Sequence, residues 1–371
     1  MRPLVPVPAV PGPSLSEALL RALDGTGPAV LPVPADRAEA ARVLAALRPE
    51  EPLEDDEVCL VVPTSGSTGE PKGVLLTAAC LQASAAATTE RLGGPGRWLL
   101  ALPVTHIAGL QVLLRSLADG EEPVTGDLAT ADLGSGRRYC SLVPTQLRRL
   151  LGSAPDALAA FDAVLVGGAA TPPALLDEAR NAGVRVVTTY GMSETSGGCV
   201  YDGQPLAGVT VSVTDRIVLS GPVVARGYRL RPDLTAEAFD GESFRTSDIG
   251  VLGPEGLVVL GRADDLVVTG GEKVAPAAVE AALSEHASVA DVAVFGVPDP
   301  EWGARVVAAV VLRPGTSLTL EQAREHVAQR VSRVAAPREL RVLDALPLLA
   351  GGKVDRARLR SSVDQHRDGG P

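Results

Sequence analysis

The chain has 371 residues, of which 46% are hydrophobic and 21% charged, and its formal net charge is −11 at pH 7. This length suits two or three domains of a globular protein. The acidic balance argues against general binding to nucleic acids or membrane surfaces. No apolar run approaches the ~20 residues of a membrane span. We therefore expect neither a nucleic-acid partner nor a membrane span.

The cysteines and the N-terminus bear on the cellular compartment. The four cysteines are widely spaced and form no C-x-x-C pair, which argues against a zinc site or a disulfide framework. The segment Met1–Pro6 is rich in proline and lacks the apolar core of a signal peptide. These features predict a protein of the reducing cytoplasm.

The first two-thirds of the chain predict strands that alternate with helices. Residues 1–57 are punctuated by proline, with helical patterns near 14–24 and 35–47. Short apolar runs bounded by turns then predict buried strands at 58–62, 98–102, 139–143, 163–166 and 184–187. Helical patterns lie at 77–91, 107–118, 145–152 and 173–182. The alternation predicts mostly parallel sheets covered by helices.

The pattern changes twice further along. Residues 208–260 lose the helical pattern and show short β-rich runs separated by Gly and Pro, which predicts an antiparallel subdomain. After that, the patterns predict a compact α+β unit with helices at 276–286 and 319–333 and strands at 291–297, 305–312 and 339–343. We expect an α/β protein with a large N-terminal domain, 1–262, and a small C-terminal domain, 263–371.

Lysine is rare, and its positions are informative. Only three of the 34 basic residues are lysines, and Lys72, Lys273 and Lys353 each lie within two residues of a glycine. A compact, mobile ammonium suits an anion site lined by closely approaching backbone better than a planar guanidinium does.

Residues 64–73 form the strongest single motif. They read Thr-Ser-Gly-Ser-Thr-Gly-Glu-Pro-Lys-Gly and follow a predicted strand. Glycines let backbone N–H groups approach phosphate oxygens, hydroxyls add donors and the lysine adds charge. The spacing differs from that of a Walker A loop. The motif predicts nucleotide binding by Thr64, Ser65, Gly66, Ser67, Thr68, Gly69 and Lys72.

This segment resembles the signature loop of the adenylate-forming superfamily, which includes acyl- and aryl-CoA ligases, peptide-synthetase adenylation domains and luciferases. Four more segments match superfamily motifs in order over most of the chain: 190–195, 246–250, 261–265, and 347–353 with Arg356. The resemblance implies that a carboxylic acid and ATP form an acyl adenylate, which a thiol converts to a thioester. The implied cofactors are ATP, Mg²⁺ and coenzyme A.

The resemblance also implies a role for each motif residue. Lys353 would bridge the carboxylate and the α-phosphate during adenylation, and Glu194, with Thr68, would hold Mg²⁺. Asp264 would be the hinge about which the mobile C-terminal domain rotates. The remaining nucleotide-binding candidates are Tyr190, Gly191, Met192, Ser193, Asp248 and Arg262, of which Tyr190 would stack on adenine and Asp248 would accept the ribose hydroxyls.

The acid pocket is expected after the second strand–helix crossover. There, by resemblance, His106 gates the pocket and is a candidate catalytic residue. Arg115 lies in an apolar helix, where a charge is costly unless it is paired or reaches an exit. No acid lies within three residues of it on either side. Two interpretations of Arg115 therefore stay open: its charge pairs with a carboxylate of the substrate, or its side chain snorkels to solvent from a helix edge. Gly168, Gly197 and Gly198 would shape a flat slot for an aromatic ring.

Three segments, 141–147, 166–170 and 199–206, resemble the o-succinylbenzoate–CoA ligases of menaquinone biosynthesis, a branch of the same superfamily. The alternatives are a small aryl- or acyl-CoA ligase for another acid, a peptide-synthetase adenylation domain, and a nucleotide-binding relative without catalysis. The expected partners are small molecules, and a homodimer is an assembly that the sequence leaves open.

Overall fold

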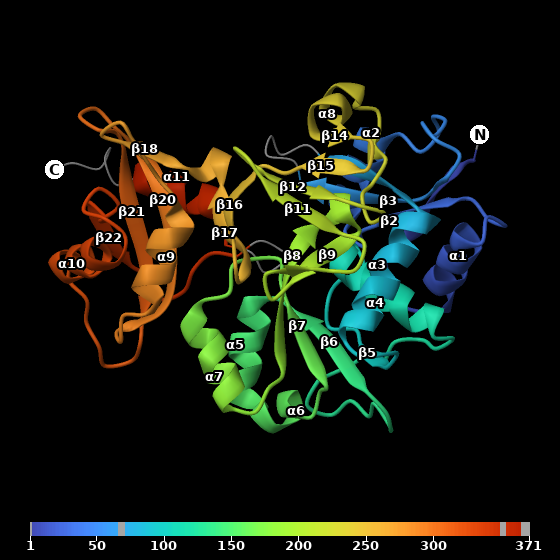
Figure 1. Ribbon diagram of the computed structural model, residues 1–371, viewed down its shortest axis with the longest axis horizontal. Coiled ribbons are helices and arrows are strands. Elements are labelled where there is room, and N and C mark those ends of the chain that lie inside the picture. The colour runs from blue at the N-terminus through green and yellow to red at the C-terminus, as the bar shows by residue number, and fades with distance from the viewer. Residues whose placement is uncertain (1, 66–70, 349–353, 365–371) are drawn as a thin grey trace. The chain divides into compact units, whose positions relative to one another are not determined.

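The computed structural model describes residues 2–65, 71–348 and 354–364 of the chain (Figure 1). Contacts divide the chain into two compact units. Unit 1 comprises residues 1–168, 179–246 and 253–257, and unit 2 comprises residues 169–178, 247–252 and 258–371. A domain boundary between residues 262 and 263 stays a prediction.

The first sheet of unit 1 buries both of its faces. Its five strands are, in spatial order, β1 (Leu4–Pro8), β2 (Ala29–Val33), β3 (Val58–Ser65), β4 (Pro71–Thr77) and β13 (Gly227–Tyr228). Side chains alternate across a strand, so Leu60, Val62, Val74 and Leu76 enter one core whereas Val61 and Leu75 enter another. The second core is closed by α2 (Arg37–Leu47), which Asp36 caps by accepting a hydrogen bond from the Glu39 N–H.

The second sheet of unit 1 carries the predicted parallel strands. Its order is β10 (Gln204–Pro205), β9 (Gly197–Tyr201), β8 (Val186–Met192), β7 (Ala163–Val166), β6 (Arg138–Leu142) and β5 (Arg97–Leu99), with β5 to β8 parallel. The two sheets share a core to which α1 (Pro13–Leu23), α3 (Ala78–Arg91) and α4 (Ile107–Ala118) contribute. Further helices are α5 (Pro144–Ser153), α6 (Pro155–Ala159) and α7 (Pro173–Asn181), of which α7 has its first six residues in unit 2.

Two predictions for the N-terminal unit need correction. The first 57 residues contain the strands β1 and β2 besides their helices. The prediction missed these strands because proline is uncommon within a sheet. Pro6 and Pro8 are tolerated because β1 is an edge strand, where a missing N–H costs no ladder hydrogen bond. The strand expected at 184–187 extends to Met192, so Tyr190 and Gly191 lie on β8.

The region 208–260 forms the expected antiparallel subdomain, with one helix that the prediction missed. The strands β11 (Thr210–Val213), β12 (Ile217–Ser220), β15 (Ser243–Arg245) and β14 (Phe239–Asp240) make a four-stranded sheet. The helix α8 (Pro232–Ala238) starts with a proline in its first turn and Asp233 behind it, which are recognisable N-terminal signals. The strands β16 (Asp248–Gly253) and β17 (Gly256–Arg262) form a separate hairpin.

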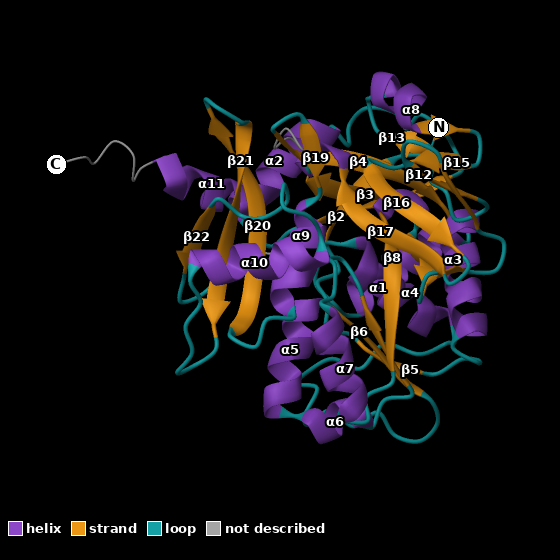
Figure 2. Ribbon diagram, turned by 60° about the vertical axis from the view of Figure 1, so that its left-hand side comes forward, coloured by secondary structure: helices purple, strands orange, loops and turns teal. Residues whose placement is uncertain are grey.

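Unit 2 has the predicted α+β character. Its sheet contains β19 (Glu272–Val274), β18 (Val267–Thr269), β21 (Gly303–Leu312), β20 (Val289–Asp299) and β22 (Glu339–Val342). Side chains of α9 (Pro276–Ser284) and α10 (Leu320–Arg330) enter the core on one face, and Leu359 of α11 (Arg356–Asp364) enters the core on the other. Figure 2 shows these helices in purple and the strands in orange.

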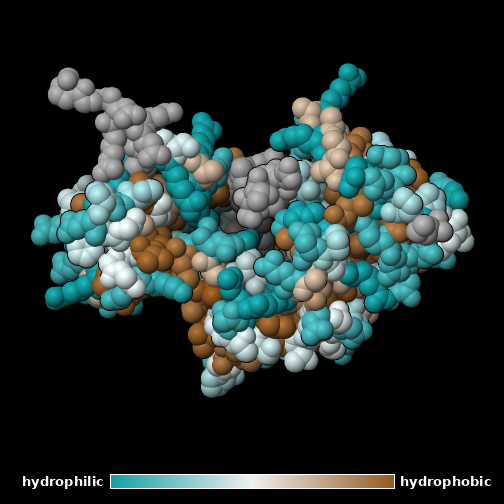
Figure 3. Space-filling view, turned by 90° about the horizontal axis from the view of Figure 1, so that it is seen from above, coloured by the Kyte–Doolittle hydropathy of each residue, from teal (hydrophilic) through white to brown (hydrophobic). Residues whose placement is uncertain are grey.

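The surface is mixed in character. Hydrophilic residues cover most of the face shown in Figure 3, and hydrophobic residues form separate patches between them. Among the described residues, no helix combines the length and the apolar character that a bilayer crossing requires.

Candidate functional site

The predicted phosphate loop joins the paired ends of β3 and β4. Thr64 lies opposite Lys72 in this hairpin, and the Thr64 hydroxyl donates a hydrogen bond to the Lys72 carbonyl at 3.3 Å. A Cβ on Gly73 would lie 2.8 Å from Leu47 and from Val61, so this glycine is needed for close packing of β4. Gly66, Ser67, Thr68 and Gly69 lie outside the described residues, as does the side chain of Ser65.

The turn after β8 positions Glu194. A short 3₁₀ helix (Ser193–Thr195) follows the strand, and the Thr195 hydroxyl accepts a hydrogen bond from the Met192 N–H at 3.0 Å. The same hydroxyl donates to the Gly197 carbonyl at 2.8 Å. A Cβ on Gly191 would lie 2.2 Å from the Gly197 oxygen, so only glycine allows β8 and β9 to approach here. The turn that carries Glu194 is therefore closely constrained.

Helices α3 and α4 hold the same turn from the core side. The Ser196 carbonyl accepts hydrogen bonds from the Ser84 hydroxyl at 3.0 Å and from the Gln111 amide at 2.8 Å. The Ser196 hydroxyl donates to the Val223 carbonyl at 2.8 Å. Sequence reasoning missed this clamp because its members are far apart in the chain and each is an ordinary polar residue.

Tyr228 brings Glu194 and Lys72 into one cluster. Its hydroxyl donates to Oε1 of Glu194 at 2.7 Å, and Nζ of Lys72 lies 5.4 Å from the centroid of its ring. Among the described residues, Oε2 of Glu194 has no hydrogen-bond partner. The sequence offered one signal for this residue, since it is one of only four tyrosines.

This cluster fits a magnesium ion that shares its ligands with phosphates. Mg²⁺ keeps several waters and takes one or two carboxylates together with substrate phosphate oxygens. Glu194 supplies one such carboxylate beside the ends of the predicted phosphate loop. The described part of the chain contains no group of three His, Cys, Asp or Glu side chains that could hold a metal alone.

One face of α4 lies along β9, as the predicted acid pocket requires. A Cβ on Gly197 would lie 3.4 Å from the Gln111 side chain and 3.9 Å from Ile107. His106 occupies the position before the helix, makes no side-chain cap there, and is exposed. Oε1 of the buried Gln111 has no hydrogen-bond partner among the described residues.

Arg115 lies two turns after Ile107 and is buried, with a relative exposure of 4%. Its guanidinium carbon lies 5.1 Å from the centroid of the Trp98 ring. Burial lowers the pKa of this guanidinium, and the electrostatic effect of the nearby Tyr201 opposes that shift. No carboxylate pairs with Arg115 in the described part of the chain, and its Nε has no hydrogen-bond partner there. Snorkelling from a helix edge is therefore wrong.

The predicted slot glycines lie on neighbouring strands. Gly168 follows β7, is exposed and has a φ of 78°, whereas Gly197 and Gly198 begin β9. The strand β8 separates them, since a Cβ on Gly198 would lie 3.2 Å from Thr189 of β8. These positions leave the slot a prediction.

The candidates of unit 2 gather at the β16–β17 hairpin. Arg262 donates to the Ser247 hydroxyl at 2.7 Å and pairs with Asp264 at 3.5 Å, and Asp248 directly follows Ser247. The Arg262 side chain is half exposed, so its other donors can reach a ligand. Lys353 lies outside the described residues.

Two of the cysteines are poorly suited to act as nucleophiles. All four lie within the described residues and are buried free thiols. Burial raises the pKa of Cys59 and of Cys199 to about 12. A thiol nucleophile must ionise, so burial disfavours this role for both residues.

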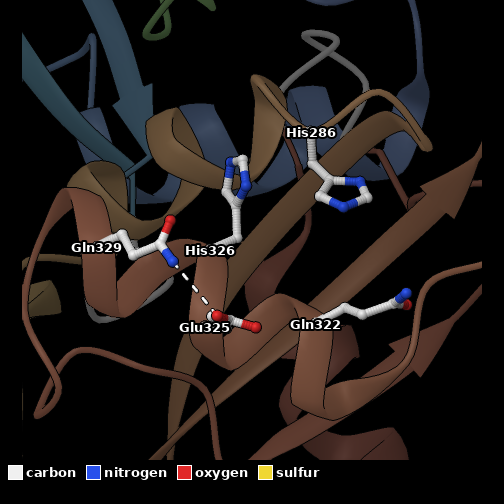
Figure 4. Close-up of a pocket in the computed structure, with 5 residues that line it drawn as sticks. All are labelled: His286, Gln322, Glu325, His326 and Gln329. Carbon is white, nitrogen blue, oxygen red and sulfur yellow. Dashed lines mark hydrogen bonds between the residues drawn. The ribbon is translucent and has the colours of Figure 1, made fainter.

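A separate hollow in unit 2 has a volume of about 210 Å³ and is lined by His286, Gln322, Glu325, His326 and Gln329 (Figure 4). The two imidazole rings meet edge to face at 5.0 Å. His326 Nε2 donates to the Ala282 carbonyl at 2.9 Å, and His286 Nδ1 accepts from the Ser288 N–H at 3.2 Å. If His286 bound a metal through Nε2, its proton would have to lie on Nδ1. Nδ1 could then no longer accept the hydrogen bond from the Ser288 N–H. The pair is therefore unsuited to hold a metal.

The stability of unit 2 should fall in mild acid because of His326. Desolvation and the nearby Arg330 and His286 lower the pKa of His326 below its usual 6.5, against the opposing effects of Ala282 and Glu285. Below pH 6.5 the unfolded chain therefore binds the proton more readily than the folded chain does. The contribution of His326 to the free energy of unfolding is complete above pH 6.5 and is lost as the pH falls through the lowered pKa. Melting curves at about pH 7.5 and 5.5 should show a smaller acid-induced drop for H326Q than for the unchanged protein. Equal drops would contradict this role.

Comparisons with known proteins show which proteins this chain is similar to. The family model described as AMP-binding enzyme matches residues 16–229, and the one described as AMP-binding enzyme C-terminal domain matches residues 278–353. The probable 2-succinylbenzoate–CoA ligase of Mycobacterium tuberculosis (strain CDC 1551 / Oshkosh) is 51% identical in an alignment 366 residues long, and the match covers 93% of this chain and 94% of that protein.

Solved structures show the same similarity. The o-succinylbenzoate CoA synthetase from Bacillus subtilis, in complex with its acyl-adenylate intermediate, matches with a TM-score of 0.73 at 27% identity, covering 93% of this chain and 81% of that chain. The same enzyme in complex with ATP and magnesium ion gives a TM-score of 0.71 at 26% identity, covering 94% and 82%.

Proposed function

The chain belongs to the AMP-binding enzyme family, and we propose that it joins 2-succinylbenzoate to coenzyme A at the expense of ATP. The single observation that carries this proposal is the 51% identity to a probable 2-succinylbenzoate–CoA ligase across 93% of the chain. This is the menaquinone-pathway activity that the sequence predicted.

The reaction has two steps. A carboxylate oxygen of the acid attacks the α-phosphorus of ATP, pyrophosphate leaves, and an acyl adenylate forms. The thiol of coenzyme A then loses its proton and attacks the acyl carbon, AMP leaves, and the thioester forms. In both steps the enzyme must hold anions next to one another, so fixed positive charge is the main requirement.

Arg115 is the proposed partner of the acid's second carboxylate. A buried guanidinium without a carboxylate partner is costly, and a dianionic acid would supply the missing charge. Trp98 and Tyr201 hold the guanidinium in place, and its Nε stays available. His106 at the start of the same helix is the proposed gate of the pocket.

The nucleotide is assigned to the β3–β4 hairpin that carries Lys72, the strand β8 that carries Tyr190 and the turn that carries Glu194. The Lys72 ammonium would contact phosphate oxygens, the Tyr190 ring would stack on adenine, and Glu194 would ligate Mg²⁺. The metal, when bound, neutralises phosphate charge. By resemblance to the superfamily motifs, Asp248 would accept the ribose hydroxyls and Arg262 would contact the ribose or a phosphate.

An acid panel tests the function. Pyrophosphate release and the mass of the CoA thioester should depend on 2-succinylbenzoate, with benzoate, acetate and amino acids giving at most background. The second carboxylate makes the difference, because benzoate offers nothing to the buried Arg115. Equal release with several aryl acids would leave an acid–thiol ligase but remove 2-succinylbenzoate as its substrate.

A further inference from the structure

We propose that Tyr228 is a positioning residue for the metal site, because its hydroxyl occupies one oxygen of Glu194 and leaves the other for Mg²⁺. The inference rests on the nucleotide and metal binding of the proposed function. It does not depend on which acid the enzyme uses.

The contact itself is strong. The Tyr228 hydroxyl donates to Oε1 of Glu194 at 2.7 Å, a length typical of a charge-assisted O–H···O⁻ hydrogen bond. Such a bond fixes the rotation of the carboxylate. Oε2 has no partner among the described residues, so this oxygen keeps its full acceptor capacity for a cation.

Tyr228 is itself held firmly. Its residue is buried, and its ring packs edge to face on Phe239 at a centroid distance of 5.3 Å. Its backbone pairs with Val74 of β4, and its N–H donates to the Thr235 hydroxyl at 2.9 Å. A group that is fixed by packing and by backbone pairing can fix another group in turn.

The segment that carries Tyr228 also holds the backbone of Glu194. The Ala225 N–H donates to the Glu194 carbonyl at 2.9 Å. Residues 225–228 therefore contact Glu194 at both its main chain and its carboxylate. A residue that served only the packing of β13 would need no bond to that carboxylate.

The Tyr228 ring also contacts Lys72, the lysine of the predicted phosphate loop. Lys72 Nζ lies 5.4 Å from its centroid, within cation–π range. Lys72 makes no ion pair among the described residues. Tyr228 thus gives Lys72 a neutral aromatic partner and gives the Glu194 carboxylate a neutral hydrogen-bond donor. Because Lys72 and Glu194 do not form an ion pair with each other, the ammonium stays available for phosphate and the carboxylate for the metal.

Metal affinity without turnover provides the test. Mn²⁺ replaces Mg²⁺, a non-hydrolysable ATP analogue replaces ATP, and electron paramagnetic resonance measures free Mn²⁺ during titration of the full chain. Substitution Y228F keeps the ring over Lys72 and removes only the hydroxyl. Since second-shell partners of metal ligands are worth about 10- to 100-fold in metal affinity, we expect a loss of that size.

Two comparisons make the result specific. Substitution Y139F removes a buried tyrosine hydroxyl elsewhere in unit 1, which bonds the carbonyls of Leu92 and Gly94, and should leave Mn²⁺ affinity unchanged. In an E194Q background, Y228F should cost no further affinity, because the tyrosine acts through Glu194. Melting temperatures of all variants report whether each is folded.

An unchanged Mn²⁺ affinity for Y228F would overturn the proposal, and so would an equal loss for Y139F or an additive loss in the E194Q background. Because the titration contains no acid and no coenzyme A, a wrong acid assignment would leave its outcome untouched.

Discussion

Replacing Lys353 with alanine is expected to slow formation of the acyl adenylate by about 10²- to 10³-fold, the usual effect of removing one charge stabiliser from a transition state. Adenylation joins a carboxylate to an α-phosphate, and a flexible ammonium can neutralise both at the moment of reaction. Thioester formation starts from an adenylate whose carbonyl carries no charge. That second step should proceed near its normal rate from supplied adenylate.

The two half-reactions can be measured apart. Acid-dependent exchange of pyrophosphate into ATP reports the first, and thioester formation from synthetic adenylate and coenzyme A reports the second. Substitution K273A is the matched control, because Lys273 is also a rare lysine near glycine, lies on β19 and is exposed. K273A should leave adenylation unchanged. If K353A slows both half-reactions equally, the assignment of Lys353 to adenylation is wrong.

The sequence predicted those parts of the molecule whose signals are local. The helix expected at 107–118 is observed at Ile107–Ala118, because its apolar residues recur at helical spacing. The alternation of strands and helices likewise predicted the second sheet. The strand β1 escaped because Pro6 and Pro8 look incompatible with a sheet until its edge position is known.

The candidate site was predicted only where a motif lies in one continuous segment. Glu194 and Lys72 each belong to such a segment, but the tyrosine that contacts both comes from β13, which pairs with β4 across a long stretch of chain. Arg115 shows the same limit, because a snorkelling and a buried arginine give the same sequence pattern. Only the packing of Trp98 and Tyr201 around it separates the two.

Substitution R115M should raise the KM of the acid by roughly 10²-fold, the cost of removing one partner from a buried charge pair. The KM of ATP should change little, because the nucleotide is assigned to other residues. Methionine fills a similar volume without charge, and removing a buried charge that lacks a carboxylate partner relieves its desolvation cost. We therefore expect the melting temperature of R115M to be no lower than that of the unchanged protein.

Arg229 provides the matched control, since it is a second buried arginine of unit 1 whose five N–H donors are all satisfied. Its guanidinium bonds the Glu54 carboxylate and the backbone carbonyls of Leu47, Arg48, Glu51 and Pro52.

Substitution R229M should therefore lower the free energy of unfolding by about 3–5 kcal/mol, the cost of breaking a buried pair, and leave the acid KM of the folded enzyme unchanged. Steady-state kinetics and melting curves on the two variants separate the roles. Arg115 keeps an unsatisfied charge that a ligand can complete, whereas Arg229 completes the fold. An unchanged acid KM in R115M, or a melting temperature as low as that of R229M, would make Arg115 a structural residue as well.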